Sequence, residues 1–199
     1  MTKTTSVTAA QLADAIEDLR GYIQPSFMNP GLVRGDVVGG LVRLAFHDAA
    51  EYLSGAGDNF RADGCVDLTK GDNGGLAAVI DGVQPYYLAH CSVFSRADFW
   101  YLAAVVSLNL AEPSGTYDVP FNFGREDASS CVYTGGRLPD AEGGFGEVRR
   151  VFIDNMGLTM TESIALLGAH TLGRTETANS GYNGPWVTAT NRFDNQFFV

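Results

Sequence analysis

The sequence predicts a mostly α-helical protein, and three observations carry that prediction. Apolar residues recur every three or four positions in several segments, as on the buried face of a helix. Thr8 and Thr159 are each followed three positions later by Gln or Glu, the capping box that opens a helix. We find no β-type run long enough to build a sheet, and no internal repeat. The 199 residues suit one or two domains and are enough to bury a core.

The first half of the chain should hold four helices separated by loops. Each helix begins at a residue whose side chain can cap the first turn or after a Gly-rich loop. In order we expect a helix after Thr8, a loop over 25–35, a helix capped by Asp36, a Gly- and Asp-rich loop to Gly75, a helix to about His90 that bends at Pro85, and a helix capped by Ser95.

The second half should be less regular. Residues 112–144 are rich in Gly and Pro, which are typical of long structured loops. A fifth helix is expected over 146–155, and a further helix runs from the Thr159 capping box to His170, with Gly173 as its terminator.

The stretch from Leu41 to Ala50 is the most informative one. It has the apolar spacing of a buried helix, yet it carries Arg43 and His47, which lie four residues apart and therefore on one face. Burying a guanidinium without a partner is expensive, so this pair points to a lined polar pocket. The alternative is an Arg that faces solvent and a core His that is bonded to a backbone carbonyl.

Composition and charge exclude some functions. The net charge of −10 leaves no basic stripe for a nucleic-acid backbone. No run approaches the ~20 apolar residues that span a bilayer, and residues 1–7 are polar, so no membrane partner is expected. We expect a soluble, intracellular protein, although a processed secreted form would look the same. Three scattered cysteines, Cys65, Cys91 and Cys131, are too few for a disulfide framework or a Cys-rich zinc site.

Two motifs resemble those of the plant-type haem peroxidase superfamily. Arg43-x-x-Phe46-His47 is similar to its distal motif, and the Gly-Ala-His-Thr-Leu-Gly run around His170 to its proximal motif. Other stretches resemble the family in the same order along the chain, with class I features similar to cytochrome c and ascorbate peroxidases; they are 72–76, 95–106, 124–127, 136–140 and 179–186.

The resemblance implies a fold and an activity. The fold would be a single two-lobed helical haem peroxidase domain over 1–199, with a distal lobe of about 1–134, a proximal lobe of about 135–199, and haem b between the distal and proximal helices. The activity would be reduction of hydrogen peroxide with oxidation of a small-molecule or protein electron donor. The alternative is a non-catalytic haem-binding remnant of this fold.

The resemblance also gives roles to single residues. His170 would be the axial ligand of the haem iron, and its alternative is a core histidine. His47 would move a proton between the two peroxide oxygens, and Arg43 would stabilise the charge on the leaving oxygen. Asn73 would accept from the other imidazole nitrogen of His47 and fix its tautomer; otherwise it is a turn residue.

Three further residues would border the haem. Phe46 would pack over the porphyrin, where cytochrome c and ascorbate peroxidases usually have Trp. Pro139 would contact the haem edge, or would be a plain turn proline. Trp186 would lie against His170, as in cytochrome c peroxidase, and would hold a radical or serve only as a core residue.

Two cation sites are suggested by the resemblance. Asp48 and Asp63 match the distal calcium site of the secreted branches, but Cys65 stands where that pattern has a serine, and a thiol is a poor Ca²⁺ ligand. Thr171 and Asp194 match the ends of a proximal cation site whose intermediate oxygen donors are replaced here. Arg192 would instead pair with Asp194.

Two positions depart from the family pattern. Ascorbate peroxidases carry a haem-edge Arg where this chain has Asn179, so ascorbate is expected to be a poor donor. The proximal His normally donates to an Asp well beyond the proximal Trp, and Val199 comes first. We therefore expect the natural protein to continue past Val199 with that Asp, or to work without it.

Overall fold

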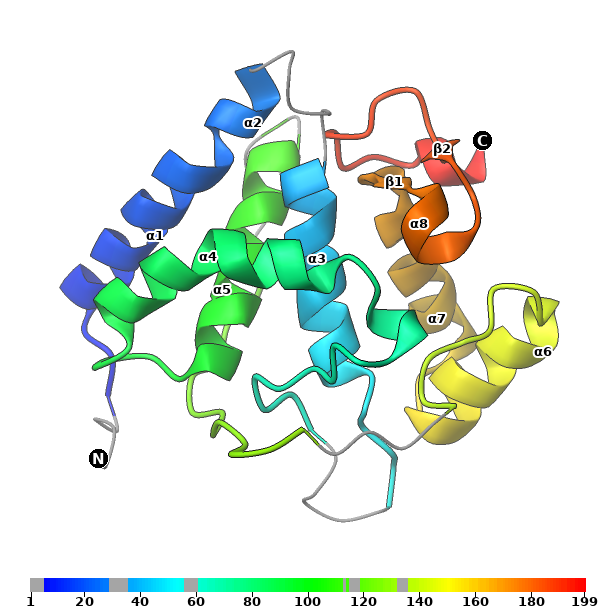
Figure 1. The fold of residues 1–199 in the computed structure, drawn as a ribbon, viewed down its shortest axis with the longest axis horizontal. Coiled ribbons are helices and arrows are strands. Elements are labelled where there is room, and N and C mark those ends of the chain that lie inside the picture. Colours follow the sequence, from blue (N-terminus) through cyan, green and yellow to red (C-terminus); the bar gives the residue numbers. More distant parts are fainter. Residues whose placement is uncertain (1–5, 29–35, 56–60, 113, 115–118, 132–135) are drawn as a thin grey trace.

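The computed structural model describes residues 6–28, 36–55, 61–112, 114, 119–131 and 136–199. Its described part is mostly helical, as predicted (Figure 1). The α-helices are α1 (Ala9–Ile23), α2 (Pro25–Met28), α3 (Asp36–Ala49), α4 (Leu76–His90), α5 (Arg96–Ala111), α6 (Gly144–Val148), α7 (Met160–Leu167) and α8 (Thr177–Ser180). Short 3₁₀ turns lie at Gly71–Asn73, Gly168–Thr171 and Gln196–Phe198, and a π-helical stretch covers Arg149–Asn155.

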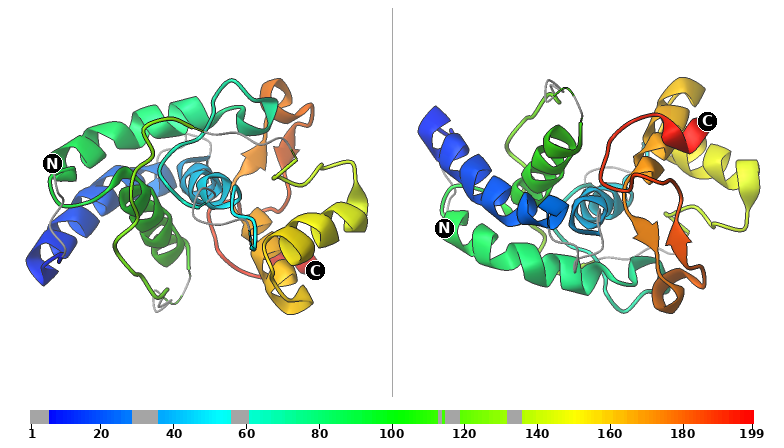
Figure 2. Two further views of the ribbon diagram at one scale, coloured as in Figure 1. Left: turned by 90° about the horizontal axis from the view of Figure 1, so that it is seen from below. Right: turned by 90° about the horizontal axis from the view of Figure 1, so that it is seen from above.

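Helix α3 lies at the centre of the molecule. Figure 2 shows it end-on, with α1, α4 and α5 on one side and α6, α7 and α8 on the other. Its residues Val38, Leu41 and Leu44 are fully buried, and it packs most extensively against α5. Apolar residues cover nearly all faces of α5, so the two helices form the core of the first lobe.

Three predicted caps are confirmed. Thr8 and Thr159 each form a complete capping box, with Gln11 and Glu162 respectively. Ser95 caps α5 by accepting from the backbone N–H of Asp98 at 3.0 Å. Each cap satisfies backbone donors that the first helical turn leaves without partners, so these sequence signals fix where the helices begin.

The second lobe is built from short elements that follow residue 136. After the π-helical stretch and α7, strands β1 (Arg174–Thr175) and β2 (Gly184–Pro185) pair antiparallel over two residues each. Among the described residues this two-stranded pair is the whole sheet, so the prediction that no run is long enough to build a larger sheet holds. The pair and the bridge between Leu172 and Asn191 fold 172–191 back on itself.

Several local predictions differ from the structure. Residues 25–28, predicted as loop, form α2, in which the Ser26 hydroxyl donates to the Ile23 carbonyl at 2.6 Å. Asp36 is the first residue of α3, and the position before it lies outside the described residues. Helix α4 ends at His90 and contains Pro85, as predicted. Helix α7, predicted to run to His170, ends at Leu167, so His170 lies in the 3₁₀ turn that follows.

One disulfide corrects the expectation drawn from the cysteine count. Cys65 and Cys131 are bridged across 66 residues of sequence, whereas Cys91 is free. The backbone N–H of Ala128 donates to the carbonyl of Asp63 at 2.9 Å, which brings the two segments side by side. A Cα–Cα distance of 5.1 Å then lies in the range that a disulfide requires. Spacing along the sequence carries no sign of this contact.

No helix among the described residues is long and apolar enough to cross a membrane.

Candidate active site

Arg43 and His47 lie on one face of α3, as their four-residue spacing predicts. The Nε–H of Arg43 donates to Nε2 of His47 at 3.2 Å. The two side chains are half-buried, so the polar pair sits at the edge of the core, on a helix whose other faces are apolar. The alternative of a solvent-facing Arg and a core His bonded to a carbonyl does not describe this geometry.

Asn73 fixes the other side of the His47 ring. Its Oδ1 lies 2.8 Å from Nδ1 of His47, and its Nδ2 donates to the carbonyl of Asp67 at 2.9 Å. Since Asp67 takes the amide N–H, the amide oxygen is the atom that faces the imidazole. His47 therefore carries its proton on Nδ1, and the lone pair of Nε2 points toward Arg43.

The surroundings keep His47 neutral. Burial, and then the charge of Arg43, lower the pKa of His47 to about 4, against smaller opposing effects of Asn73 and Asp72. A neutral imidazole with one nitrogen occupied as a donor is poised to accept a proton at the other. This is the state that a general base requires.

Two backbone carbonyls hold the Arg43 guanidinium. Nη1 donates to the carbonyl of Gly74 at 2.7 Å, and Nη2 donates to that of Asp72 at 2.8 Å. With the bond to His47, these contacts use three of its five N–H groups. Two N–H groups of the guanidinium remain unused. Because three hydrogen bonds fix the side chain, these two groups have a fixed direction, which electrostatic stabilisation of a developing charge requires.

Phe46 and the segment of Pro139 lie on the second-lobe side of this helix. The Phe46 ring makes edge contacts with His47 at 5.9 Å and with Phe152 at 6.0 Å between centroids. Pro139 is half-buried. Arg150 holds its loop by donating to the carbonyls of Gly136 and Leu138.

His170 is held by a contact that the sequence reasoning missed. Its Nδ1 donates to the carbonyl of Leu167 at 3.0 Å, three residues earlier in the chain. A carbonyl only accepts, so Nδ1 carries the proton and Nε2 keeps its lone pair. Burial lowers the pKa of His170, which favours the neutral imidazole that binds metals.

Two aromatic rings flank His170. Trp186 lies 4.8 Å from it between ring centroids, as the resemblance implied, and Phe197 lies at 5.2 Å. The Trp186 side chain is 44% exposed, so it is not an ordinary core residue in the described part of the chain. Phe197 has no distinctive motif around it, and its role could not be found from sequence.

Thr171 and Asp194 meet directly. The buried Thr171 hydroxyl donates to Oδ1 of Asp194 at 3.0 Å, and Arg192 Nε lies 3.6 Å from Oδ2 of the same carboxylate. The expected Arg192–Asp194 pair is therefore present. It ties the turn that carries His170 to the segment that carries Phe197.

Asp48 and Asp63 do not form a convincing calcium site. The buried Asp48 carboxylate accepts backbone N–H groups from Asp63, Gly64 and Cys65 at 3.0–3.2 Å. Cys65 is committed to a disulfide. Among the described residues no group of three His, Cys, Asp or Glu side chains is arranged to hold a metal. The Ca²⁺ suggestion is left without support, and Asp48 instead anchors the loop after α3.

Comparison with known proteins identifies the family. A family model described as peroxidase matches residues 19–199. The chain belongs to the peroxidase family. L-ascorbate peroxidase 3 of Arabidopsis thaliana is 38% identical over 162 residues, which cover 80% of this chain and 54% of that protein. The cytosolic L-ascorbate peroxidase 1 of Oryza sativa subsp. indica is 34% identical over 202 residues, covering 100% of this chain and 77% of that protein.

A fungal relative points the same way. A protein of Aspergillus fumigatus that is provisionally named a heme-binding peroxidase is 39% identical over 190 residues, covering 90% of this chain and 56% of the relative. The chain thus spans about half the length of several of the peroxidases that it matches. The predicted plant-type haem peroxidase fold is confirmed at the level of the family and of the helical architecture.

Proposed function

We propose that this peroxidase-family chain is a single haem peroxidase domain that reduces hydrogen peroxide at the expense of an electron donor. The observation that carries the proposal is the state of His47: Asn73 holds its Nδ1 and leaves a neutral Nε2 as a proton acceptor. His170, in the turn that follows α7, offers a second neutral imidazole with a free Nε2 lone pair. Helix α7 lies on the opposite side of α3 from α1, α4 and α5 (Figure 2).

The donor set fits a haem group. His170 has its Nδ1 proton bonded to Leu167, so Nε2 is available as an axial iron ligand. Phe46 contacts His47 and Trp186 contacts His170, so each histidine has an aromatic ring beside it that suits a flat porphyrin. Pro139 would contact the haem edge. Haem bound there would supply the redox chemistry: it would give two electrons to peroxide and recover them from the electron donor.

His47 would handle the proton. An O–H group of peroxide can donate to Nε2 from the direction that the Arg43 N–H now occupies at 3.2 Å. His47 would accept that proton and return it to the other oxygen as the O–O bond breaks, so that water can leave. The Nδ1 bond to Asn73 keeps the ring from turning while it does so.

Arg43 would stabilise the developing negative charge. Its guanidinium stays cationic although burial lowers its pKa. The carbonyls of Asp72 and Gly74 hold it in place before the reaction, so little reorganisation is needed when charge appears on the leaving oxygen.

The electron donor is proposed to be a small phenol or a basic protein and not ascorbate. Several relatives are named ascorbate peroxidases, but here Asn179 stands at the position where the resemblance places their haem-edge Arg. The Asn179 side chain packs against Gly75, close to the carbonyl that holds Arg43, and brings no positive charge to attract an anionic donor. The net charge of −10 favours a cationic partner.

The test is steady-state peroxide consumption by the haem-loaded chain with phenol, ascorbate and a basic cytochrome as donors. We expect turnover with a higher kcat/KM for phenol or the cytochrome than for ascorbate, and a turnover in His47→Leu that is slower by about 10²–10⁴-fold. Asn179→Arg should raise the kcat/KM for ascorbate alone. Haem binding without turnover for any donor would identify the chain as a non-catalytic remnant.

A further inference from the structure

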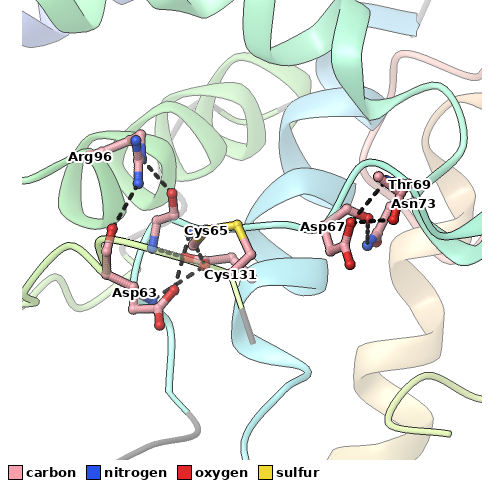
Figure 3. The surroundings of a disulfide bond; sticks show 10 residues. Asp63, Cys65, Asp67, Thr69, Asn73, Arg96 and Cys131 are labelled. Carbon is pink, nitrogen blue, oxygen red and sulfur yellow. Dashed lines mark hydrogen bonds between the residues drawn. A yellow bond between two sulfur atoms is a disulfide. The ribbon is translucent and has the colours of Figure 1, made fainter. Parts of the chain in front are cut away.

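The disulfide joins two loops beside the distal helix. Cys65 belongs to the loop that follows α3, and Cys131 lies at the end of the segment that follows α5 (Figure 3). Cys65 is buried, whereas Cys131 is exposed. Both cysteines also line an open pocket, and access of a dissolved thiol to the bridge is what thiol–disulfide exchange requires.

The loop that carries Cys65 reaches His47 by two routes. The backbone N–H of Cys65 donates to Oδ1 of Asp48 at 3.1 Å, and Asp48 is the residue next to His47 on α3. Two residues beyond Cys65, the carbonyl of Asp67 accepts from Nδ2 of Asn73 at 2.9 Å. Since Asn73 Oδ1 faces His47 Nδ1, the position of the 65–67 backbone decides how the His47 ring is held.

There is room beside the bridge for this loop to move. A cavity of about 180 Å³ is lined by both cysteines, Val66, Gln84, Arg96 and Trp100, among others. Trp100 Nε1 is buried without a hydrogen-bond partner in the described structure. The pocket and the Trp100 donor both lie beside the disulfide, so the 65–67 backbone has space there into which it can shift.

We propose that the Cys65–Cys131 disulfide is a redox-dependent positioning element for His47: the bridge keeps Asp67 against Asn73, and its reduction loosens the hold of Asn73 on the His47 ring. Cleavage lets 65–67 relax into the cavity, which lengthens the bond from Asn73 Nδ2 to Asp67. An amide with a weakened bond on one side turns more freely, and hydrogen bonds weaken steeply once distance and angle depart from their optimum.

The chemistry balances with a dithiol reductant and with peroxide as oxidant. One thiolate of the reductant attacks the sulfur of Cys131, the S–S bond breaks, and Cys65 leaves as a thiolate that takes up a proton. The second thiol of the reductant resolves the mixed disulfide, which yields two cysteine thiols and the reductant's own disulfide. In the reverse direction one cysteine thiolate takes an oxygen from hydrogen peroxide to form a sulfenic acid and release water, and the other thiol condenses with it to re-form the bridge with loss of a second water.

Hydrogen peroxide, by re-forming the disulfide, would therefore restore the orientation of the His47 ring that the reaction needs. This step rests on the proposed function, since it takes hydrogen peroxide as the reacting substrate. Excess reductant would leave His47 loosely oriented, and rising peroxide would restore the bridge and the Asn73–His47 bond together.

A direct test follows the His47 ring in the haem-free chain by ¹⁵N NMR of the imidazoles. The chain has three histidines, so His90 and His170 serve as internal controls. In the oxidised protein the His47 nitrogens should show the shifts of one tautomer with the proton on Nδ1. After reduction with a dithiol, with two new thiols verified by alkylation and mass spectrometry, the His47 shifts alone should move toward the average of the two tautomers.

Two variants distinguish the effect of losing the disulfide from the effect of losing any cysteine. Cys131→Ser should give the reduced-state His47 shifts permanently, and Cys91→Ser, which removes the free cysteine, should behave as wild type. Addition of hydrogen peroxide to the reduced wild type should restore the oxidised spectrum, and should fail to do so in Cys131→Ser. Identical His47 shifts in the oxidised, reduced and Cys131→Ser proteins would overturn the proposal.

The haem-loaded protein gives a second readout. Reduction should slow the reaction with peroxide by about 10-fold while haem content stays unchanged, in line with the loss of an outer-shell contact. An unchanged rate with shifted His47 resonances would overturn the functional half of the proposal. If the oxidised protein does not react with peroxide at all, the proposed function fails, and the NMR comparison still decides whether the bridge positions His47.

Discussion

Gly39 of α3 lies against Gly173, which comes two residues after the 3₁₀ turn of His170. A Cβ atom added to Gly39 would stand 2.8 Å from the Cα of Gly173 and 3.0 Å from its nitrogen. The helix that carries His47 and the segment that carries His170 thus touch backbone to backbone. This contact sets the separation of the two histidines.

Gly39→Ala should therefore destabilise the protein although Ala is the better helix former. Alanine gains about 1 kcal/mol of helix propensity, but a clash with backbone forces the two segments apart and typically costs about 1–3 kcal/mol. We expect a lower midpoint of chemical unfolding and weaker haem retention. Gly21→Ala in α1 is the matched control, since nothing lies within 4 Å of its added Cβ. A more stable Gly39→Ala protein with full haem affinity would show that the contact is not needed.

His47→Leu should remove the proton acceptor and leave haem binding intact. A positioned acid–base group contributes roughly 10²–10⁴-fold to a rate, so the peroxide reaction measured by stopped flow should slow by about that factor. Leucine preserves most of the ring's volume beside Phe46. A rate within about threefold of wild type would end the assignment of His47 as general base.

The distal half of the site was predictable from local sequence because its geometry is local. The four-residue spacing of Arg43 and His47 places both side chains on one face of any α-helix, whatever surrounds it. Asn73 was reached through resemblance. The hydrogen bond from Asn73 to the Asp67 carbonyl could not be predicted, because every residue has a backbone carbonyl and the sequence does not show which one accepts.

The proximal half shows the limit of the same reasoning. His170 was placed at a helix end, but the α-helix stops at Leu167, and in the 3₁₀ turn that follows the Nδ1 partner of His170 is the Leu167 carbonyl. Helix ends are the least predictable part of a helix. The Cys65–Cys131 bridge depends on a contact across 66 residues, for which no sequence spacing is diagnostic.

The pH dependence of the peroxide reaction should report the low pKa of His47. Burial and the charge of Arg43 lower this pKa to about 4, so the ring stays a neutral base down to that pH. We expect kcat/KM for peroxide to be flat from neutral pH down to about pH 5 and to fall below about pH 4. The same limb should be missing in His47→Leu. A limb with its midpoint near 6.5, the ordinary value, would mean that the ring is not shielded as described.

His170→Ala should abolish the axial ligand without disturbing the distal pair. Haem should bind weakly or leave an iron site that added imidazole refills, with partial return of the Soret spectrum. Trp186→Phe serves as a control, because it keeps an aromatic ring beside His170 and leaves the imidazole itself unchanged. A Soret spectrum unchanged in His170→Ala would exclude this residue as the ligand.

Glu51 gives a prediction about stability rather than activity. Its side chain is only 9% exposed at the end of α3, and burial, followed by the charges of Asp63 and Asp48, raises its pKa to about 7. Because the folded-state pKa lies above the unfolded value, the stability due to the neutral carboxyl is complete below about pH 4.5 and is lost as the pH rises through 7.

Glu51→Gln keeps the neutral shape at every pH. Since one pKa unit corresponds to about 1.4 kcal/mol, the variant should gain about 1–3 kcal/mol in free energy of unfolding over wild type at pH 8 and nothing near pH 4. Urea unfolding of both proteins at the two pH values measures this. Glu17→Gln on the exposed face of α1 is the control and should show no such difference between the two pH values. An equal effect of Glu51→Gln at pH 4 and pH 8 would mean that folding does not raise the pKa of Glu51.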